Sequence, residues 1–382
     1  MFESRSKWLL LGWLFIDRIA YTLNWLSIAP AQPFIVEELG ITVTSLGLLG
    51  AVFLIGIGSF QIPAGLLAAK YNPKKIAIIG LALSSLFAGL CGLATSFPAL
   101  LLFRFLAGVF MSFFFGPGIA FFTPFFNVRE RGVALGIYNA GFHVGTLIAL
   151  GAWPYLITSA GWRLGLLVPG MLGILLAAIT YSIARGFPVN KNSEGINLTV
   201  LRNRDVWLAA FGLTVAGGAW YPLTQFGILY ITSQTNLSLE TAGMLVSLLS
   251  VGSIIGAPVS GRVYDTVSSR RGLFLVVSGG ISVGLVALAT PSIHIVVAAM
   301  LALGFLTTSA HTIYYLLPMG RVSETQISLA VALINGVHLL GASALPYFFA
   351  VCVELFGYGF AWVGVAFVSL ISLLVVFRLR FN

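Results

Sequence analysis

The chain has 382 residues, of which 59% are hydrophobic and only 8% are charged, and it contains 43 glycines and 30 phenylalanines. A soluble domain carries roughly 25% charged residues, so this composition excludes a soluble protein and indicates an integral membrane protein. The net charge of +9 does not indicate nucleic-acid binding, because the Lys and Arg residues gather at one side of the predicted membrane segments.

Twelve apolar segments are long enough to cross a bilayer, which takes about 20 helical residues. In chain order they cover residues 8–30, 43–70, 73–96, 98–124, 130–157, 163–184, 205–233, 237–263, 271–290, 292–318, 326–353 and 357–377. An even number of crossings places both termini on one side. The sequence therefore predicts an all-α membrane protein with twelve transmembrane helices.

The chain repeats itself with an offset of 196 residues. GLLAAKYNPKK (65–75) aligns with GRVYDTVSSRR (261–271), and three further pairs coincide: Gly108 with Gly304, Asn139 with Asn335, and Gly145 with Gly341. A repeat of this length predicts two homologous six-helix bundles, over residues 1–185 and 205–382, joined by a linker at 186–204. Secondary transporters with this organisation hold the substrate between the halves near the bilayer midplane.

The positions of the basic residues predict the orientation. They border the even-numbered loops and the termini, at Lys7, Lys70, Lys74, Lys75, Arg129, Arg131, Arg202, Arg204, Arg270, Arg271, Arg378 and Arg380. Cytoplasmic loops of membrane proteins carry such an excess of Lys and Arg. We therefore expect a multi-pass protein of the cell membrane with both termini and the linker in the cytoplasm.

Several kinds of site are absent from the sequence. Cys91 and Cys352 lie inside apolar segments, so we expect no disulfide framework. His residues on separate helices lack the local ligand spacing of a metal site. There is no HExxH, nucleophile elbow or P-loop, so we expect neither an enzyme nor a cofactor.

Two charged residues lie deep inside the first segment, where charge is costly. Asp17 and Arg18 follow about ten residues of helix, and such residues usually face a cavity or a partner. Neighbouring residues point about 100° apart on a helix, so the two side chains diverge. One reading points Arg18 at the substrate and Asp17 at another helix. The alternative is a structural ion pair between Asp17 and Arg104.

Polar and aromatic residues in other segments complete the predicted substrate site. Arg104 opens RFLAG in the fourth segment, where it either contacts substrate or bridges the first and fourth helices. The whole predicted set is Arg18, Tyr21, Trp25, Arg104, Trp220, Tyr221, Gln225, His311, Tyr315 and Asn335. Amphipathic aromatic residues suit a ligand cavity, although they also suit packing between helices.

Three residues are candidates for carrying a coupled proton: Asp17, His143 and His338. His143 and His338 occupy nearly equivalent positions in the fifth helix of each half. Histidine titrates near neutral pH, which suits proton transfer, but a buried histidine is also a common packing residue.

These motifs resemble the major facilitator superfamily over the whole chain. The family signature between the second and third helices, G-x-L-a-D-r-x-G-r-r, is similar to the segment with Gly65, Leu67, Lys74 and Lys75, and to its repeat with Gly261, Asp265, Arg270 and Arg271. RERGVALGIYNAGFHVG (129–145) and GWR (161–163) are further family-like segments. The resemblance implies that Lys74, Lys75, Arg129, Asp265, Arg270 and Arg271 form a gate.

Two departures from the family pattern affect that gate and the substrate class. The first signature copy has Ala69 in place of its acid and Asn72 in place of its second Gly, so only Asp265 can act as the gate carboxylate. The fifth helix has Gly141-Phe142 where the antiporter motif of the family has Gly-Pro, which disfavours drug efflux.

Within the superfamily, the Asp17-Arg18 pair resembles the anion:cation symporter branch, whose members carry organic anions and sugar acids. In that branch the Arg binds the anionic group of the substrate. A Glu that helps to couple protons lies seven residues after the fourth-helix Arg, and this chain has Met111 there. Coupling then falls to Asp17 or to a histidine, or it is absent.

The sequence therefore predicts a monomeric secondary transporter that moves a small organic anion, a carboxylate or a sugar acid, with a proton as coupling ion, by alternating access. An alternative is efflux of an apolar or cationic compound along Phe113, Phe114 and Phe115. A non-transporting membrane sensor is a further alternative. An enzyme acting on lipid would need a catalytic set that the sequence does not offer.

Overall fold

The computed structural model describes residues 4–188, 198–320, 322 and 327–379. The first half of the chain contains α1 (Ser4–Leu26), α2 (Ile28–Leu39), α3 (Val43–Lys70), α4 (Pro73–Leu90), α5 (Phe97–Phe122), α6 (Val128–Leu147), α7 (Trp153–Ala160) and α8 (Trp162–Ala184). The second half contains α9 (Arg204–Gly217), α10 (Trp220–Gln234), α11 (Leu239–Thr266), α12 (Arg270–Ala287), α13 (Ile293–Leu316), α14 (Ile327–Ala342) and α15 (Ala344–Arg378). Short helical turns are η1 (Cys91–Leu93), η2 (Thr123–Phe125), η3 (Ile148–Ala152), η4 (Leu198–Arg202) and η5 (Leu317–Gly320).

Each of the twelve predicted segments has a helical counterpart. In the described part of the chain, ten helical stretches are long and apolar enough to cross a membrane. One of them, Leu329–Arg378, is 50 residues long and is interrupted at Gly357, where φ is 85°, so it covers the last two predicted segments. The first predicted segment corresponds to α1 and α2 together, and the helix continues to Leu39, beyond the predicted end at residue 30.

The internal repeat reappears as equivalent packing in the two halves. Gly56 and Gly108 lie where α3 and α5 cross, and an added Cβ on Gly108 would meet the carbonyl oxygen of Phe53. In the second half, Gly252 and Gly304 lie where α11 and α13 cross, and a Cβ on Gly304 would meet the carbonyl oxygen of Leu249. Each of these residues is 196 positions after its counterpart. Small residues permit this close approach of membrane helices.

Four of the twelve predicted segments are broken near the middle of the molecule. Ser27 separates α1 from α2, and Gly218 with Ala219 separates α9 from α10. The π-helical turn η3 interrupts the path from α6 to α7, and Ser343 separates α14 from α15. The breaks therefore fall in the first and fifth predicted helix of each half. Broken membrane helices are tolerated where they line a cavity or are buried in protein.

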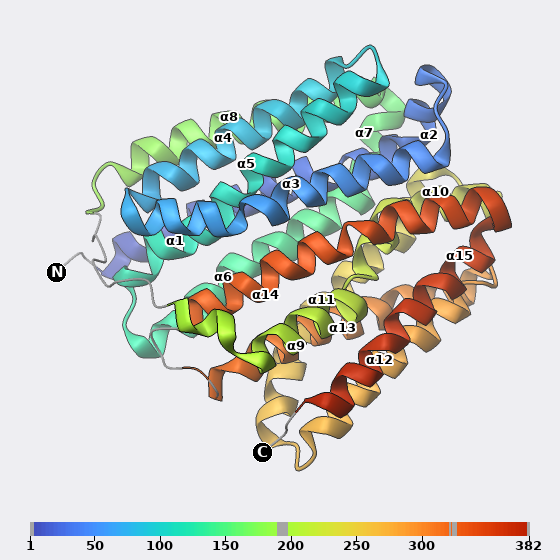
Figure 1. Cartoon of the computed structure of the whole chain (residues 1–382). Coiled ribbons are helices and arrows are strands. Elements are labelled where there is room, and N and C mark those ends of the chain that lie inside the picture. Colours follow the sequence, from blue (N-terminus) through green and yellow to red (C-terminus); the bar gives the residue numbers. More distant parts are fainter. Residues whose placement is uncertain (1–3, 189–197, 321, 323–326, 380–382) are drawn as a thin grey trace.

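Figure 1 shows the helices of the first half on one side and those of the second half on the other, with both described chain ends at the same end of the bundle. We call this end the terminal end and the opposite one the distal end. The halves are joined at the distal end, where the Gln225 amide donates to the Leu46 carbonyl oxygen at 2.7 Å and the Thr44 hydroxyl donates to Glu354. These two contacts hold the halves together distally.

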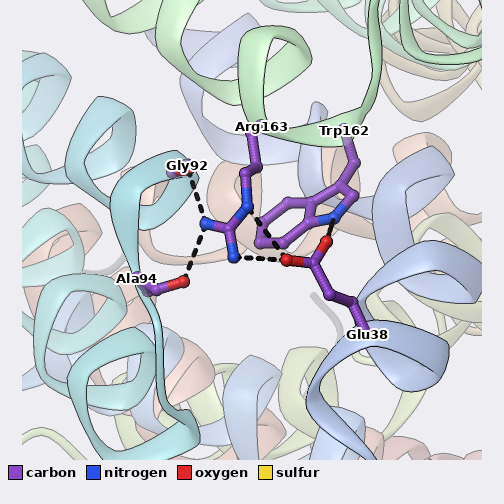
Figure 2. A network of polar contacts seen from close by, with 5 residues as sticks. All are labelled: Glu38, Gly92, Ala94, Trp162 and Arg163. Atoms are coloured by element: carbon purple, nitrogen blue, oxygen red, sulfur yellow. Dashed lines mark hydrogen bonds and ion pairs between the residues drawn. The ribbon is translucent and has the colours of Figure 1, made fainter.

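A polar cluster fixes the distal end of the first half (Figure 2). Arg163 donates to the Glu38 carboxylate from Nε (3.1 Å) and Nη2 (2.6 Å), and from Nη1 to the carbonyl oxygens of Gly92 (3.0 Å) and Ala94 (2.8 Å). The Trp162 indole donates to the other Glu38 oxygen at 2.6 Å. The cluster ties α2, η1 and α8 together. Because these hydrogen bonds favour the ionised form, with Arg163 the largest contribution, they lower the pKa of the Glu38 carboxyl from its ordinary value of 4.5.

Candidate substrate site

Arg18 is held in a cage of aromatic rings inside the first half. Its side chain projects from α1 and is 7% exposed. The guanidinium carbon lies 4.4 Å from the centre of the Tyr21 ring, 4.3 Å from Phe115, 5.7 Å from Tyr138 and 5.0 Å from Phe142. Ring faces attract cations, and the attraction grows when water is excluded. The rings therefore stabilise a positive charge here.

Two donor atoms of Arg18 are unpaired. Its Nε and Nη1 atoms are buried and have no hydrogen-bond partner within the described residues. Arg carries five N–H donors in a planar fork that matches a carboxylate or phosphate. Within the described residues Arg18 also forms no ion pair.

Asp17 points away from Arg18, as the helical geometry predicts. It interacts with the Thr180 hydroxyl on α8, although the Asp17 Oδ1 and Thr180 Oγ1 atoms do not reach hydrogen-bond geometry. Its side chain is 1% exposed. Asp17 thus lies between α1 and α8, within the first half.

The alternative ion pair between Asp17 and Arg104 is wrong. Arg104, on α5, donates instead to the carbonyl oxygens of Asn24 (3.2 Å) and Trp25 (2.6 Å). These carbonyls lie at the end of α1, where the break at Ser27 frees them from the helix. The guanidinium also stacks over the Phe53 ring at 3.8 Å. Arg104 bridges the first and fourth helices by capping the broken end of α1.

An aromatic layer closes the space between the halves. We use this name for Trp25, Phe142, Trp220 and Tyr221. Trp25 stacks on Tyr221 with ring centres 6.3 Å apart, and it meets Trp220 and Phe142 edge-on at 6.2 and 5.9 Å. Phe142 belongs both to this layer and to the cage around Arg18, so the layer lies directly beside the cage.

A small cavity lies on the distal side of the aromatic layer. Its lining includes polar groups from both halves, namely Gln32, Arg104, Thr224 and Gln225, together with Trp25 and Tyr221. The Gln32 side chain is fully buried, and neither of its amide atoms has a hydrogen-bond partner within the described residues. Four of the predicted substrate residues therefore line this cavity, whereas Arg18 and Tyr21 belong to the cage.

The remaining predicted site residues form a network in the second half. The Tyr221 hydroxyl lies 3.0 Å from His338 Nε2, which lies 3.2 Å from His311 Nε2. Tyr315 donates to the Asn335 side-chain oxygen at 2.8 Å. His143, on α6, interacts electrostatically with both Arg18 and His311. The network thus lies close to the cage through Tyr221 and His143.

The predicted gate residues lie at the terminal end. Lys74 donates to the carbonyl oxygens of Ala184 and Phe187 at 2.8 and 2.9 Å, which ties α4 to the end of α8 within one half. Arg270 lies over the Tyr264 ring at 4.8 Å. The other members, Lys75, Arg129, Asp265 and Arg271, are exposed. Their role in gating stays a prediction.

Reasoning from the sequence did not assign several residues to the site, although it named Phe115 and Phe142 for other reasons. Phe115, Tyr138 and Phe142 complete the cage, and Gln32 lines the cavity. Tyr138 and Phe142 are one helical turn apart, which places them on one face of α6. That spacing is the only signal in the sequence that pointed to them.

Comparison with known proteins agrees with this architecture. The probable L-galactonate transporter of Escherichia coli (strain K12) is 26% identical over 279 residues, which cover 66% of this chain and 60% of that protein. The probable nitrate/nitrite antiporter NarK1 of Thermus thermophilus is 28% identical over 290 residues, which cover 70% of this chain and 65% of that protein. The alignments thus span less than two thirds of these relatives' lengths.

The same fold occurs in a crystal structure of a bacterial homolog to the human lysosomal transporter Spinster, in an inward-facing and unoccupied conformation. The TM-score is 0.84 with 18% identity, over 98% of this chain and 97% of that one. At this identity the likeness concerns the fold. The family model described as Major Facilitator Superfamily matches residues 14–233 and 208–382, which together span most of the chain. This chain is a multi-pass membrane protein that belongs to the Major Facilitator Superfamily of secondary transporters.

Proposed function

We propose that this transporter carries a small organic anion, a carboxylate or a sugar acid, together with a proton. The observation that supports this most is the state of Arg18: a buried guanidinium, caged by four aromatic rings, whose Nε and Nη1 donors have no partner within the described residues. A charged residue in the bilayer centre costs about 2.5–3.5 kcal/mol on insertion scales. An anionic substrate would offset that cost and use the free donors.

The names of the relatives support the same substrate class. One is named as a probable transporter of L-galactonate, a sugar acid, and another as a probable nitrate/nitrite antiporter. Both named substrates are anions. The cage would receive the anionic group, and the polar side chains around the aromatic layer would contact the rest of the molecule.

The three phenylalanines of the efflux alternative diverge in the structure. Phe113 lies near Phe60 and Phe110, Phe114 stacks on Tyr21, and Phe115 lies beside Arg18. They do not line a common apolar path. No observation therefore favours efflux of an apolar or cationic compound over anion transport.

We further propose that both termini face the cytoplasm, because the excess of basic residues at the terminal end follows the positive-inside rule. A tag placed in the linker at residues 190–198 would test this orientation by its accessibility from the cytoplasm. Those residues lie almost wholly outside the described part of the chain. With this orientation the distal contacts between the halves lie at the outer side of the membrane. Closing the terminal end would bring the predicted gate residues of the two halves together, and opening the distal end would break the Gln225 and Thr44 contacts.

Transport by the purified protein in liposomes tests the proposal. L-galactonate and nitrate are offered, with L-galactose as a matched neutral control. Uptake of an anion without uptake of the neutral sugar supports the proposal. Uptake of cationic dyes instead of either anion would replace it with the efflux function, and binding of an anion without any flux would indicate a sensor.

A further inference from the structure

Two histidines from neighbouring helices meet ring edge to ring edge in the second half. His311 on α13 and His338 on α14 place their Nε2 atoms 3.2 Å apart, and the Tyr221 hydroxyl lies 3.0 Å from the same His338 atom. His338 is fully buried. Such a contact requires a hydrogen on one of the facing nitrogens, so the positions of the protons can be worked out from their neighbours.

The His311 ring has one defined proton. Its Nδ1 atom lies 2.8 Å from the carbonyl oxygen of Thr307. A carbonyl oxygen only accepts hydrogen bonds, so Nδ1 must carry the hydrogen. A neutral imidazole has a single N–H. The His311 Nε2 atom is therefore a bare acceptor that faces His338.

When His338 is neutral, one ring nitrogen of the histidine pair is left without a hydrogen-bond donor. With its hydrogen on Nε2, the ring donates to His311, but its Nδ1 lone pair is buried without a partner within the described residues. With its hydrogen on Nδ1, the His338 Nε2 lone pair accepts from the Tyr221 hydroxyl at 3.0 Å, and the His311 Nε2 lone pair, 3.2 Å away, is left without a donor. In either tautomer the pair lacks one proton. Buried polar groups in native proteins are rarely left in this state.

One added proton removes the deficit. A doubly protonated His338 ring donates from Nε2 to His311 and presents Nδ1–H to the backbone of Leu213, with which the ring interacts. The Tyr221 hydroxyl can then no longer donate to His338 Nε2, because the single N–H of that atom is directed at His311. No bond other than N–H forms, and the proton comes from solvent on the side of His311, which is partly exposed.

We propose that the His311–His338 pair holds the coupled proton, in the second half of the transporter rather than on Asp17. This rests on the proposed proton-coupled function. Tyr221 connects the pair to the aromatic layer, since it contacts His338 through its hydroxyl and Trp25 through its ring. Gain or loss of the proton would therefore act on the contact between the halves.

The groups around the pair explain why an anion would favour its protonation. The neighbours are the Leu213 backbone from α9, Tyr221 from α10, Thr307 and Tyr315 from α13, Asn335 from α14 and His143 from α6. No carboxylate contacts either ring in the described part of the chain. A substrate anion bound at Arg18 would supply the missing negative charge, and proton and anion would then bind cooperatively.

The experiment compares four histidine variants of the full-length protein in liposomes, because the chain has four histidines. His311→Gln and His338→Gln test the pair, His143→Gln tests the nearest other histidine, and His294→Gln is the control on an exposed residue. The probe is L-galactonate, with nitrate as the second anion. One coupled proton supports an accumulation of about tenfold per unit of pH gradient.

We expect His311→Gln and His338→Gln to retain exchange of the anion while pH-driven accumulation falls to equal concentrations on both sides. His294→Gln should accumulate normally. Full accumulation in both pair variants, or its loss in an Asp17→Asn variant alone, would overturn the proposal.

A second readout needs no substrate and separates this proposal from the proposed function. In protein labelled with ¹⁵N-histidine in lipid bilayers, the His311 and His338 nitrogens should respond to pH in one shared step that either Gln variant abolishes. If the wild type transports neither anion but this step is present, the proton site stands and the substrate class is wrong. Independent titration of the two rings, or no response between pH values of about 4 and 9, would overturn the proton site itself.

Discussion

Trp25 and Tyr221 stack across the boundary between the two halves, with ring centres 6.3 Å apart and planes only 8° from parallel. Trp25 comes from the last turn of α1 and Tyr221 from the first turn of α10, so each residue lies beside the break in the first helix of its half. The pair therefore connects the broken first helix of one half to the broken first helix of the other. On one side of the stack lies the cage of Arg18, and Tyr221 leads on the other side to the two histidines.

Two substitutions of Tyr221 distinguish the contribution of its ring from the contribution of its hydroxyl. Tyr221→Phe keeps the stack on Trp25, so we expect the closed distal end to persist. Tyr221→Ala removes an aromatic contact worth about 0.5–1.5 kcal/mol, which should shift the equilibrium towards distal opening by about two- to tenfold. Double electron–electron resonance between a label at the distal end of α3 and a label next to the turn of α15 at Gly357 measures the populations. Equal populations in the two variants would show that the stack does not hold the halves together.

Gln225 should contribute to distal closure by its hydrogen bond to the Leu46 carbonyl oxygen. Gln225→Ala removes a bond of about 0.5–1.5 kcal/mol, which should increase opening. Alkylation of a cysteine placed at the buried position Leu49, by an impermeant reagent added from the distal side, measures it. Cys91 and Cys352 are first replaced by Ala. Gln234→Ala, at an exposed position on the same helix, is the control, and equal alkylation rates in the two variants would contradict the prediction.

Arg104 should act on stability more than on substrate binding, because its guanidinium caps the carbonyls of Asn24 and Trp25. Hydrogen bonds from charged groups contribute about 1.5–3 kcal/mol each. Arg104→Gln should therefore lower the thermal stability of the ligand-free protein strongly, and Arg104→Lys, which cannot reach both carbonyls with one fork, should lower it less. Arg262→Lys, at an exposed site, is the control. An Arg104→Gln protein of normal stability that fails to bind the anion would make Arg104 a substrate residue instead.

The cluster around Glu38 should make the stability of the first half depend on pH. Its pKa is lowered from 4.5 in the folded state, chiefly by Arg163 and then by Trp162. A depressed carboxyl pKa contributes stability that is present above pH 4.5 and is lost as the pH falls through the folded value. Glu38→Gln should lower the melting temperature at pH 7 and flatten its dependence on pH below 4.5. Glu37→Gln, its exposed neighbour, should leave both unchanged, and a wild-type decrease that survives in Glu38→Gln would assign it to another group.

The fold could be predicted from the sequence because apolar segments and the glycine repeat record it directly. Gly108 and Gly304 permit the same helix crossing in both halves, and their spacing is visible in the sequence. The break at Ser27 and the continuation of the helix to Leu39 were missed. Pro30, Gln32 and Pro33 make that stretch look like the end of a span, whereas burial between the halves stabilises it as a helix.

The candidate site could be predicted only in part. Arg18 was identified because a charge in an apolar segment is costly wherever the side chain points. Its cage was not, because Phe115 and Tyr138 come from other helices and 30 phenylalanines offer too many candidates. His311 and His338 were both named, but for different roles. Their separation of 27 residues on two helices does not reveal that the rings meet.

Arg18, in its cage inside the first half, is the group on which anion binding should depend most. The measurement is the affinity of purified protein for the anion that the wild type transports, by calorimetry, in wild type, Arg18→Lys and Arg18→Ala, with Arg262→Ala as the control. Because charge-assisted hydrogen bonds contribute about 1.5–3 kcal/mol, Arg18→Ala should weaken binding by about 10- to 150-fold. Arg18→Lys should lie between, since it keeps the charge without the planar fork. Binding at full strength by well-folded Arg18→Ala protein would contradict the account.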